Sequence, residues 1–248
     1  MNEIADNLGV VLQRLQSACA RAGRLPDAVR LIAVSKAFPV QAVETAMAAG
    51  QCRFGENYLQ EALGKIEMLG DAALEWHFIG PIQSNKTREI ASHFAWVHGV
   101  ERLRIIERLS AQRPQGLPPL NVCVQVNISG EASKSGCSLE QTPELCAAIA
   151  ALPRLRLRGL MAIPEAVEDA EASRPAFRRL RTLFEQIHSA GAINPVDFDT
   201  LSMGMSGDFD VAVEEGATLV RVGSAIFGAR SPQGLPVPPP SQKKRNPS

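Results

Sequence analysis

Apolar residues follow two different spacings along this chain. Near its start they recur at the spacing of an α-helix, at Ile4, Leu8, Val11, Leu12 and Leu15. This pattern predicts an amphipathic helix that runs to about Gly23. The next segment, 31–36, is short, branched and apolar, which is typical of a strand covered on both faces. Pro39 then begins a stretch with helical character that ends at Gly50.

The same alternation of strand and helix continues to about residue 222. Further helices are predicted from 57, from 84 and from 101, after the capping box formed by Ser138 and Gln141, over 177–187, and from 207. The predicted strands cover 31–36, 52–54, 76–80, 95–98, 121–128, 157–163, 198–201 and 218–222.

Eight strands separated by segments of helix length favour parallel pairing through right-handed crossovers. We therefore predict an α/β protein with a single (β/α)₈ TIM barrel and an extra N-terminal helix. An open doubly wound sheet is the alternative. No G-x-G-x-x-G follows the first strand and no G-x-x-x-x-G-K-[ST] occurs, so neither phosphate-binding motif supports a nucleotide site.

The character of the sequence changes near its C-terminal end. Residues 231–248 contain six of the 17 prolines and show neither helical nor strand periodicity. We expect one domain over residues 1–230 and a disordered proline-rich tail over 231–248.

The balance of charges and the cysteines narrow the class of protein. Lys and Arg number 26, as do Asp and Glu, so the composition does not favour nucleic acid or a membrane surface as a partner. The five cysteines lack the CxxC or histidine spacing of a zinc site. No signal peptide or membrane span is apparent, and we expect a cytoplasmic protein that binds a small ligand.

Lys36 ends the first predicted strand. Active sites of (β/α)₈ barrels lie at the carboxyl ends of the strands, so we expect its side chain at the barrel mouth. Partial desolvation there favours the neutral amine, which is the form that attacks an aldehyde. A solvated or salt-bridged lysine is the alternative, and position alone favours it.

Small polar turns follow the last two predicted strands. Residues 201–207 carry two glycines and two serines before a predicted helix, and Gly223 with Ser224 follows strand eight. Barrels often bind phosphate at this place, although the glycines also suit tight turns. Arg221 is expected to point inward next to the first strand, where either a pyridine nitrogen or a protein carboxylate would be its partner.

These residues lie in a set of motifs that together are highly specific. From the first helix to Arg230 the sequence resembles the pyridoxal phosphate homeostasis proteins, also called proline synthase co-transcribed proteins, whose fold matches the barrel domain of alanine racemase. The motifs are AVSK (33–36), FGENYLQEA (54–62), WHFIGPIQSNK (76–86), VNISGEASKSG (126–136), RGLMAIP (158–164), LSMGMSGD (201–208) and VRVGSAIFGAR (220–230).

The resemblance implies a binding site for pyridoxal 5′-phosphate with no catalytic residue and no metal ligand. Lys36 would form a Schiff base, and Arg221 would lie beside the pyridine nitrogen. The phosphate would bind around Ser206, Gly207, Gly223 and Ser224. Three more residues match positions around the cofactor ring, with structural roles as alternatives: Asn57 (an N-cap), His77 (a core histidine) and Met161 (a core methionine).

Two classes of function then compete. Alanine racemase adds a C-terminal domain that supplies a tyrosine base, whereas this chain has one tyrosine, Tyr58, in its second barrel unit. We therefore expect a monomeric, non-catalytic binder that serves vitamin B6 homeostasis by storing, buffering or delivering pyridoxal phosphate to apoenzymes. The alternative is a one-domain enzyme that acts weakly on amino acids, as a racemase does.

Overall fold

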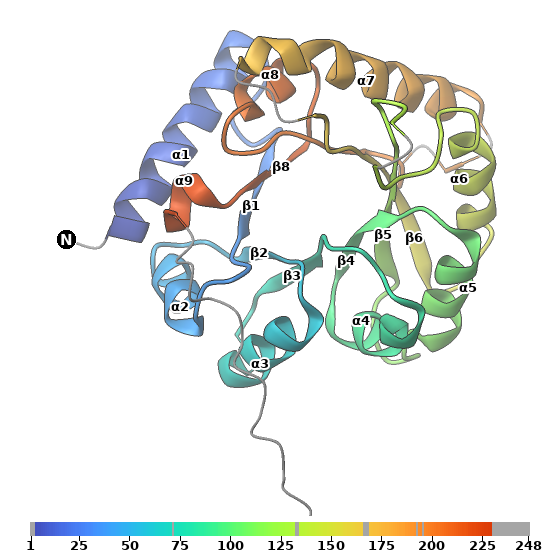
Figure 1. Ribbon diagram of the computed structural model, residues 1–248, viewed down its shortest axis with the longest axis horizontal. Coiled ribbons are helices and arrows are strands. Elements are labelled where there is room, and N and C mark those ends of the chain that lie inside the picture. Colours follow the sequence, from blue (N-terminus) through green and yellow to red (C-terminus); the bar gives the residue numbers. More distant parts are fainter. Residues whose placement is uncertain are drawn as a thin grey trace, which may run out of the picture.

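The computed structural model describes residues 3–70, 72–131, 134–165, 169–191, 193–194 and 196–229. Arg230 and the expected tail at 231–248 lie outside the described residues. Eight parallel strands pair in chain order and form a closed barrel, so the TIM barrel prediction is confirmed and the open sheet is wrong (Figure 1). The strands are β1 (Arg30–Val34), β2 (Arg53–Glu56), β3 (Glu75–Phe78), β4 (Trp96–Val100), β5 (Leu120–Gln125), β6 (Leu155–Met161), β7 (Thr200–Ser202) and β8 (Leu219–Val222).

Helices connect the strands and surround the barrel, as Figure 1 shows. The capping box is confirmed, because Ser138 and Gln141 each accept a hydrogen bond from the other's backbone N–H just before α6. The helices are α1 (Glu3–Arg21), α2 (Val40–Ala48), α3 (Leu59–Leu69), α4 (Thr87–His93), α5 (Leu103–Gln112), α6 (Thr142–Ala150), α7 (Arg174–Ser189), α8 (Phe209–Glu214) and α9 (Ser224–Phe227), with 3-10 helices η1 (Ser84–Lys86) and η2 (Ala170–Ser173).

Strand ends differ from the predicted ones by up to three residues. The predicted strand 121–128 ends at Gln125 in the structure, although Val126 and Ile128 are buried beyond it. Apolar residues continue past the hydrogen-bonded ladder because the loops at the barrel mouth also pack against the core. Hydrophobic pattern alone therefore overestimates the length of such a strand.

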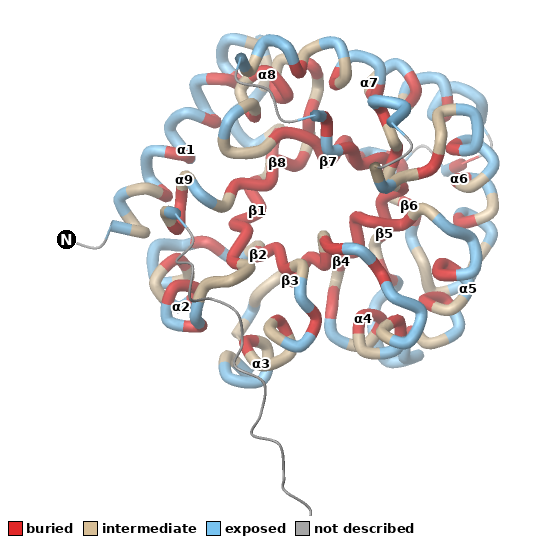
Figure 2. Tube along the Cα trace, in the orientation of Figure 1, coloured by how far each residue is buried: buried red, intermediate tan, exposed pale blue. Residues whose placement is uncertain are grey.

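The strands form a buried ring inside a partly exposed layer of helices (Figure 2). The larger apolar core lies between the outer faces of the strands and the helices. A second, smaller cluster of inward-facing residues fills the barrel, consistent with a packed interior. Its buried members are Ile32, Val34, Trp96, Cys123, Met161 and Leu219.

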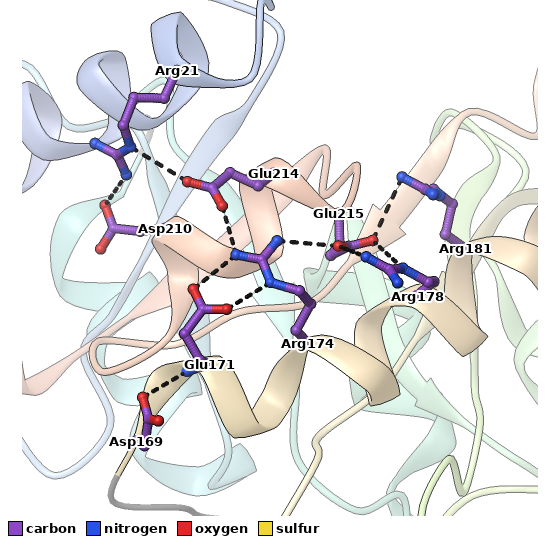
Figure 3. Close-up of polar contacts among 9 residues, drawn as sticks. All are labelled: Arg21, Asp169, Glu171, Arg174, Arg178, Arg181, Asp210, Glu214 and Glu215. Atoms are coloured by element: carbon purple, nitrogen blue, oxygen red, sulfur yellow. Dashed lines mark hydrogen bonds and ion pairs between the residues drawn. The ribbon is translucent and has the colours of Figure 1, made fainter.

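The extra helix α1 packs against α8 and α9, beside strands β1 and β8 (Figure 1). Arg24, just after α1, donates hydrogen bonds to the carbonyls of Val213 and Ala217. Figure 3 shows a cluster of ion pairs between α7 and α8, in which Arg174 and Arg178 both contact the buried Glu215. The Arg24 contacts join the N-terminal part of the chain to its last barrel unit, and the ion pairs join the successive helices α7 and α8. No helix in the described part of the chain is long and apolar enough to cross a membrane.

Candidate functional site

A cavity of about 290 Å³ opens at the carboxyl ends of six strands. Seven of the nine predicted cofactor-binding residues line it, from segments as far apart as β1 and α9. Lys36 is the one lysine among the described lining residues. The lining consists of Val34, Lys36, Asn57, Ile79, Ile163, Met205, Ser206, Gly207, Arg221, Gly223 and Ser224.

Lys36 lies in the turn that follows β1, two residues beyond the strand's last residue. The backbone N–H of Ser35 donates to the carbonyl of Gly55 on β2, and the N–H of Phe38 donates to the carbonyl of Ser35. Ala37 has a φ of 65°, a left-handed conformation that costs a residue with a side chain some strain. The turn is thus sharply bent at the residue after Lys36.

A buried cluster of charged side chains binds the residues on either side of Lys36. Lys65 of α3 donates to the carbonyl of Ser35 at 2.8 Å, to Glu56 at 2.7 Å and to Glu61 at 2.6 Å. Glu56 also accepts from the Ser35 hydroxyl at 2.7 Å, and Glu61 accepts from the N–H of Ala37 at 2.7 Å. Both neighbours of Lys36 are therefore tied to one ammonium and two carboxylates.

Burial raises the pKa of the Glu56 carboxyl, while the Lys65 ammonium and the Ser35 hydroxyl act in the opposite direction. The second oxygen of Glu56 is buried and has no hydrogen-bond partner among the described residues. Sequence reasoning missed the roles of Glu56, Glu61 and Lys65. The spacing of Glu61 and Lys65 (i, i+4) was a signal for an ion pair, but it did not show that the pair reaches the turn after β1.

The turn after β7 presents unused hydrogen-bond donors to the cavity. The backbone N–H groups of Ser206 and Gly207 donate to no group in the described part of the chain. No atom lies within 4 Å of the place where a Cβ on Gly207 would stand, so the missing side chain leaves open space. The Ser206 hydroxyl accepts from the N–H of Ala225 at 3.4 Å and so links this turn to α9.

The start of α8 is less open than the sequence suggested. The N–H groups of Asp208 and Phe209 both donate to the carbonyl of Met205, and the N–H of Met205 donates to the Asp208 carboxylate at 2.7 Å. The turn therefore closes on itself ahead of α8. Free donors for an anion come from Ser206 and Gly207, not from the amides of Asp208 and Phe209 at the helix start.

Gly223 brings the turn after β8 against β1. A Cβ at this position would lie 3.1 Å from the carbonyl oxygen of Val34, which is tighter than most side-chain contacts. Glycine thus permits the close approach that places Ser224 and Lys36 around the same cavity.

Arg221 lies at the inner side of the cavity with 4% of its surface exposed. One terminal nitrogen donates to the backbone carbonyl and the hydroxyl of Ser202, at 2.7 and 2.6 Å, and the other donates to the carbonyl of Ala162 at 3.0 Å. Burial lowers the pKa of the guanidinium to about 10, so it stays charged near neutral pH. No carboxylate among the described residues forms an ion pair with it, although that was one of the two partners considered from the sequence.

Asn57 follows β2 and reaches the cavity. Its amide oxygen is buried and has no hydrogen-bond partner among the described residues. Such an atom is costly unless a ligand or water bonds to it. Asn57 does not cap a helix, because α3 begins at Leu59 after Tyr58, so the N-cap alternative is not observed.

His77 and Met161 are not among the residues that line the cavity. His77 lies within β3, fully buried, and its ring nitrogens contact His98 and Glu75. Met161 is buried in the barrel interior. Both side chains point into the barrel below its mouth, so the structure favours the core roles that the sequence left open for them, and their contact with a cofactor ring stays a prediction.

A larger groove of about 780 Å³ lies on the outer surface along α7, where Leu139, Arg174 and Leu183 contribute to its walls. It lies away from the strand ends and contains none of the predicted site residues. The described residues contain no group of three or more His, Cys, Asp or Glu side chains that could hold a metal ion. The cavity at the barrel mouth is therefore the candidate site.

Comparison with solved structures identifies the same fold. PipY of Synechococcus elongatus, solved with PLP bound, is 34% identical with a TM-score of 0.77, and the match covers 91% of this chain and 100% of that chain. An alanine racemase of Corynebacterium glutamicum is 19% identical with a TM-score of 0.65, covering 95% of this chain and 63% of that chain. At that identity the likeness to the racemase concerns the fold alone.

Comparison with known sequences confirms the resemblance drawn from the motifs. A pyridoxal phosphate homeostasis protein of Pseudomonas aeruginosa is 59% identical over 230 residues, which cover 93% of this chain and 97% of the relative. One from Escherichia coli K12 is 52% identical over 240 residues, covering 93% and 98%. The family model of the alanine racemase N-terminal domain matches residues 8–231. The chain therefore belongs to the alanine racemase N-terminal domain family and, within it, to the pyridoxal phosphate homeostasis proteins.

Proposed function

We propose that this chain binds pyridoxal 5′-phosphate covalently through Lys36 and serves in the homeostasis of that cofactor. One observation carries the proposal: the described wall of the cavity contains a single lysine, and across the same cavity lie the unused amides of Ser206 and Gly207. An aldehyde that also carries a phosphate fits both features. The names of the relatives and the PLP-bound PipY structure support the same ligand.

The residues present fit each part of this cofactor. The amine of Lys36 condenses with the aldehyde and releases water. The amides of Ser206 and Gly207, with the hydroxyls of Ser206 and Ser224, donate to the phosphate oxygens. Arg221, which lines the cavity, would donate to the pyridine nitrogen, and the buried amide oxygen of Asn57 would accept from a ring substituent.

Within this proposal the protein stores or delivers the cofactor and does not turn over a substrate at an enzyme's rate. When bound, the cofactor supplies an electrophilic carbon and an electron-withdrawing ring. A charged Arg221 beside the pyridine nitrogen keeps that nitrogen unprotonated and so limits the ring as an electron sink. The same proposal includes a monomer that delivers the cofactor to apoenzymes. It also includes a reducing compartment such as the cytoplasm, and the five free cysteines support that location.

The proposal is tested by loading the purified protein with pyridoxal phosphate and recording its absorbance before and after borohydride reduction. Peptide mapping of the reduced protein should find the cofactor on Lys36. Lys36→Ala should abolish the covalent product and keep the fold, whereas the matched control Lys86→Ala should label as the wild type does. A label on Lys86 or Lys134 of the wild type would contradict the assignment.

The competing enzyme function has its own outcome in the same preparation. Racemisation of L-alanine by the loaded protein at roughly 1–10³ per second, a range typical of enzymes, would favour the enzyme function over the binder if Lys36→Ala abolished it. We expect turnover far below that range. Chiral chromatography of alanine after incubation measures it.

A further inference from the structure

A continuous chain of hydrogen bonds runs through the interior of the barrel, from the cavity to the opposite end. It begins at Arg221, whose terminal nitrogen contacts the Ser202 hydroxyl at 2.6 Å. The remaining links all join side chains of different residues on β3, β4 and β7. They are Ser202 Oγ to His98 Nδ1 (2.8 Å), His98 Nε2 to His77 Nδ1 (2.9 Å) and His77 Nε2 to Glu75 Oε1 (2.9 Å).

The two ends of this chain fix the position of every proton in it. Ionised Glu75 can only accept a hydrogen bond, so the facing nitrogen of His77, Nε2, carries a proton. In a neutral imidazole the other nitrogen then accepts, so His98 donates from its own Nε2. Nδ1 of His98 accepts from the Ser202 hydroxyl, whose oxygen in turn accepts from Arg221. Each group in the chain donates toward Glu75.

The surroundings of the two histidines support neutral rings. Both side chains are fully buried, and burial lowers the pKa of His77 and, further, that of His98. Arg30 and Arg53 act on His77 in the same direction, Arg30 and Arg221 do so on His98, and Glu75 acts on His77 in the opposite direction. Burial of Glu75 would raise the pKa of its carboxyl, but its contacts with His77, the hydrogen bond first, and the Arg53 guanidinium outweigh burial and lower that pKa.

We propose that Ser202, His98 and His77 are positioning residues that couple Arg221 at the cavity to Glu75 at the far end of the barrel, with both imidazoles neutral and protonated on Nε2. The buried guanidinium of Arg221 has no direct carboxylate partner. These hydrogen bonds connect it, through polarised groups, to the carboxylate of Glu75. They also fix the orientation of the guanidinium, because three of its five N–H groups are used by Ser202 and Ala162. The other two N–H groups remain for a ligand.

The proton positions can be measured without any cofactor. The protein has four histidines, so a long-range nitrogen-15 NMR spectrum of its apo form is simple. The other two histidines, His93 and His188, are exposed and serve for assignment. At about pH 7 we expect both buried rings as the single Nε2–H tautomer. A proton on Nδ1 of either ring, alone or in addition to one on Nε2, would overturn the proposal.

Substitution of Glu75, at the end of the hydrogen-bond chain away from the cavity, distinguishes coupling through hydrogen bonds from simple packing. Glu75→Leu removes the terminal acceptor, and we expect the ring of His77 to exchange between tautomers, with averaged nitrogen shifts. Glu75→Gln should restore the wild-type pattern, because its amide oxygen still accepts from Nε2. Asp199→Asn is the matched control, since Asp199 pairs with Arg158 and bonds to neither histidine. Unchanged shifts in Glu75→Leu would show that the carboxylate does not fix the tautomers.

The effect at the cavity is measured separately and rests on the proposed function. Ser202→Ala breaks the link next to Arg221, and we expect pyridoxal phosphate to bind about two- to tenfold more weakly, the effect of losing one ordinary hydrogen bond. Cys123→Ala, another buried change inside the barrel, should have less effect on binding. If the NMR result holds and binding is unchanged in Ser202→Ala, the chain exists but does not position Arg221. If no variant, including the wild type, binds the cofactor, the proposed function fails while the NMR result stands.

Discussion

At the scale of single residues, the serines of the two turns should determine how tightly a phosphate is held. Ser206 and Ser224 both line the cavity, from the turn after β7 and the start of α9. Hydrogen bonds to a charged group contribute about 1.5–3 kcal/mol each. We predict that the double variant Ser206→Ala, Ser224→Ala binds pyridoxal phosphate at least about tenfold more weakly, measured by equilibrium dialysis. Ser92→Ala, on α4 and outside the cavity, is the control. If the double variant retained pyridoxal phosphate as well as the wild type does, the phosphate would have to bind elsewhere.

At the scale of elements, α3 holds the turn that carries Lys36. Lys65 is buried and pairs with the fully buried Glu56, so removal of the ammonium leaves a carboxylate without its cation. Losing one partner of a buried pair costs about 3–5 kcal/mol. We predict a loss of this size in the free energy of unfolding for Lys65→Met, measured by urea denaturation, together with slower covalent labelling of Lys36.

The double variant Glu56→Gln, Lys65→Met provides the control for that prediction. Replacing both partners leaves no buried charge, so it should recover at least half of the lost stability. Labelling of Lys36 should stay slow, because the contact from Lys65 to the Ser35 carbonyl is still missing. A double variant as unstable as the single one would show that the loss comes from packing and not from the unpaired carboxylate.

At the scale of the whole molecule, the two buried histidines should make the fold sensitive to acid. The pKa values of His77 and His98 are lowered in the folded protein, whereas in the unfolded chain they return to about 6.5. Below that pH the unfolded state binds more protons than the native state, so the free energy of unfolding falls as the pH falls. The stability that comes from keeping the rings neutral is complete above about pH 6.5 and is lost toward the lowered pKa values.

We predict that this loss reaches up to about 1.4 kcal/mol per pH unit for each histidine. Urea denaturation at several pH values between 7.5 and 5 measures the slope. His98→Gln should reduce the slope even if it also lowers stability at neutral pH, because one titrating group is gone. His188→Gln, at an exposed position, should leave the slope nearly unchanged. Identical slopes in the wild type and His98→Gln would contradict neutral burial of that ring.

Most of the architecture and much of the candidate site followed from the sequence alone. Eight strands of branched apolar residues alternating with helix-length segments predicted the barrel, with an open doubly wound sheet as the alternative that only the structure excluded. The rule that strand ends meet at one mouth then predicted that Lys36, Ser206 and Arg221 share a site, and the family resemblance added Asn57. All four line one cavity. Their roles toward a cofactor remain predictions.

Tertiary structure alone decided how that site is supported. The contact between Lys65 and Ser35 spans 30 positions and the one between His98 and Ser202 spans 104, and no periodicity in the chain relates such residues. Strand pattern gives the face on which His77 and Met161 lie, but depth within the barrel depends on register between neighbouring strands. Hydrogen bonds between side chains need positions accurate to a few tenths of an ångström, which only the packed barrel supplies.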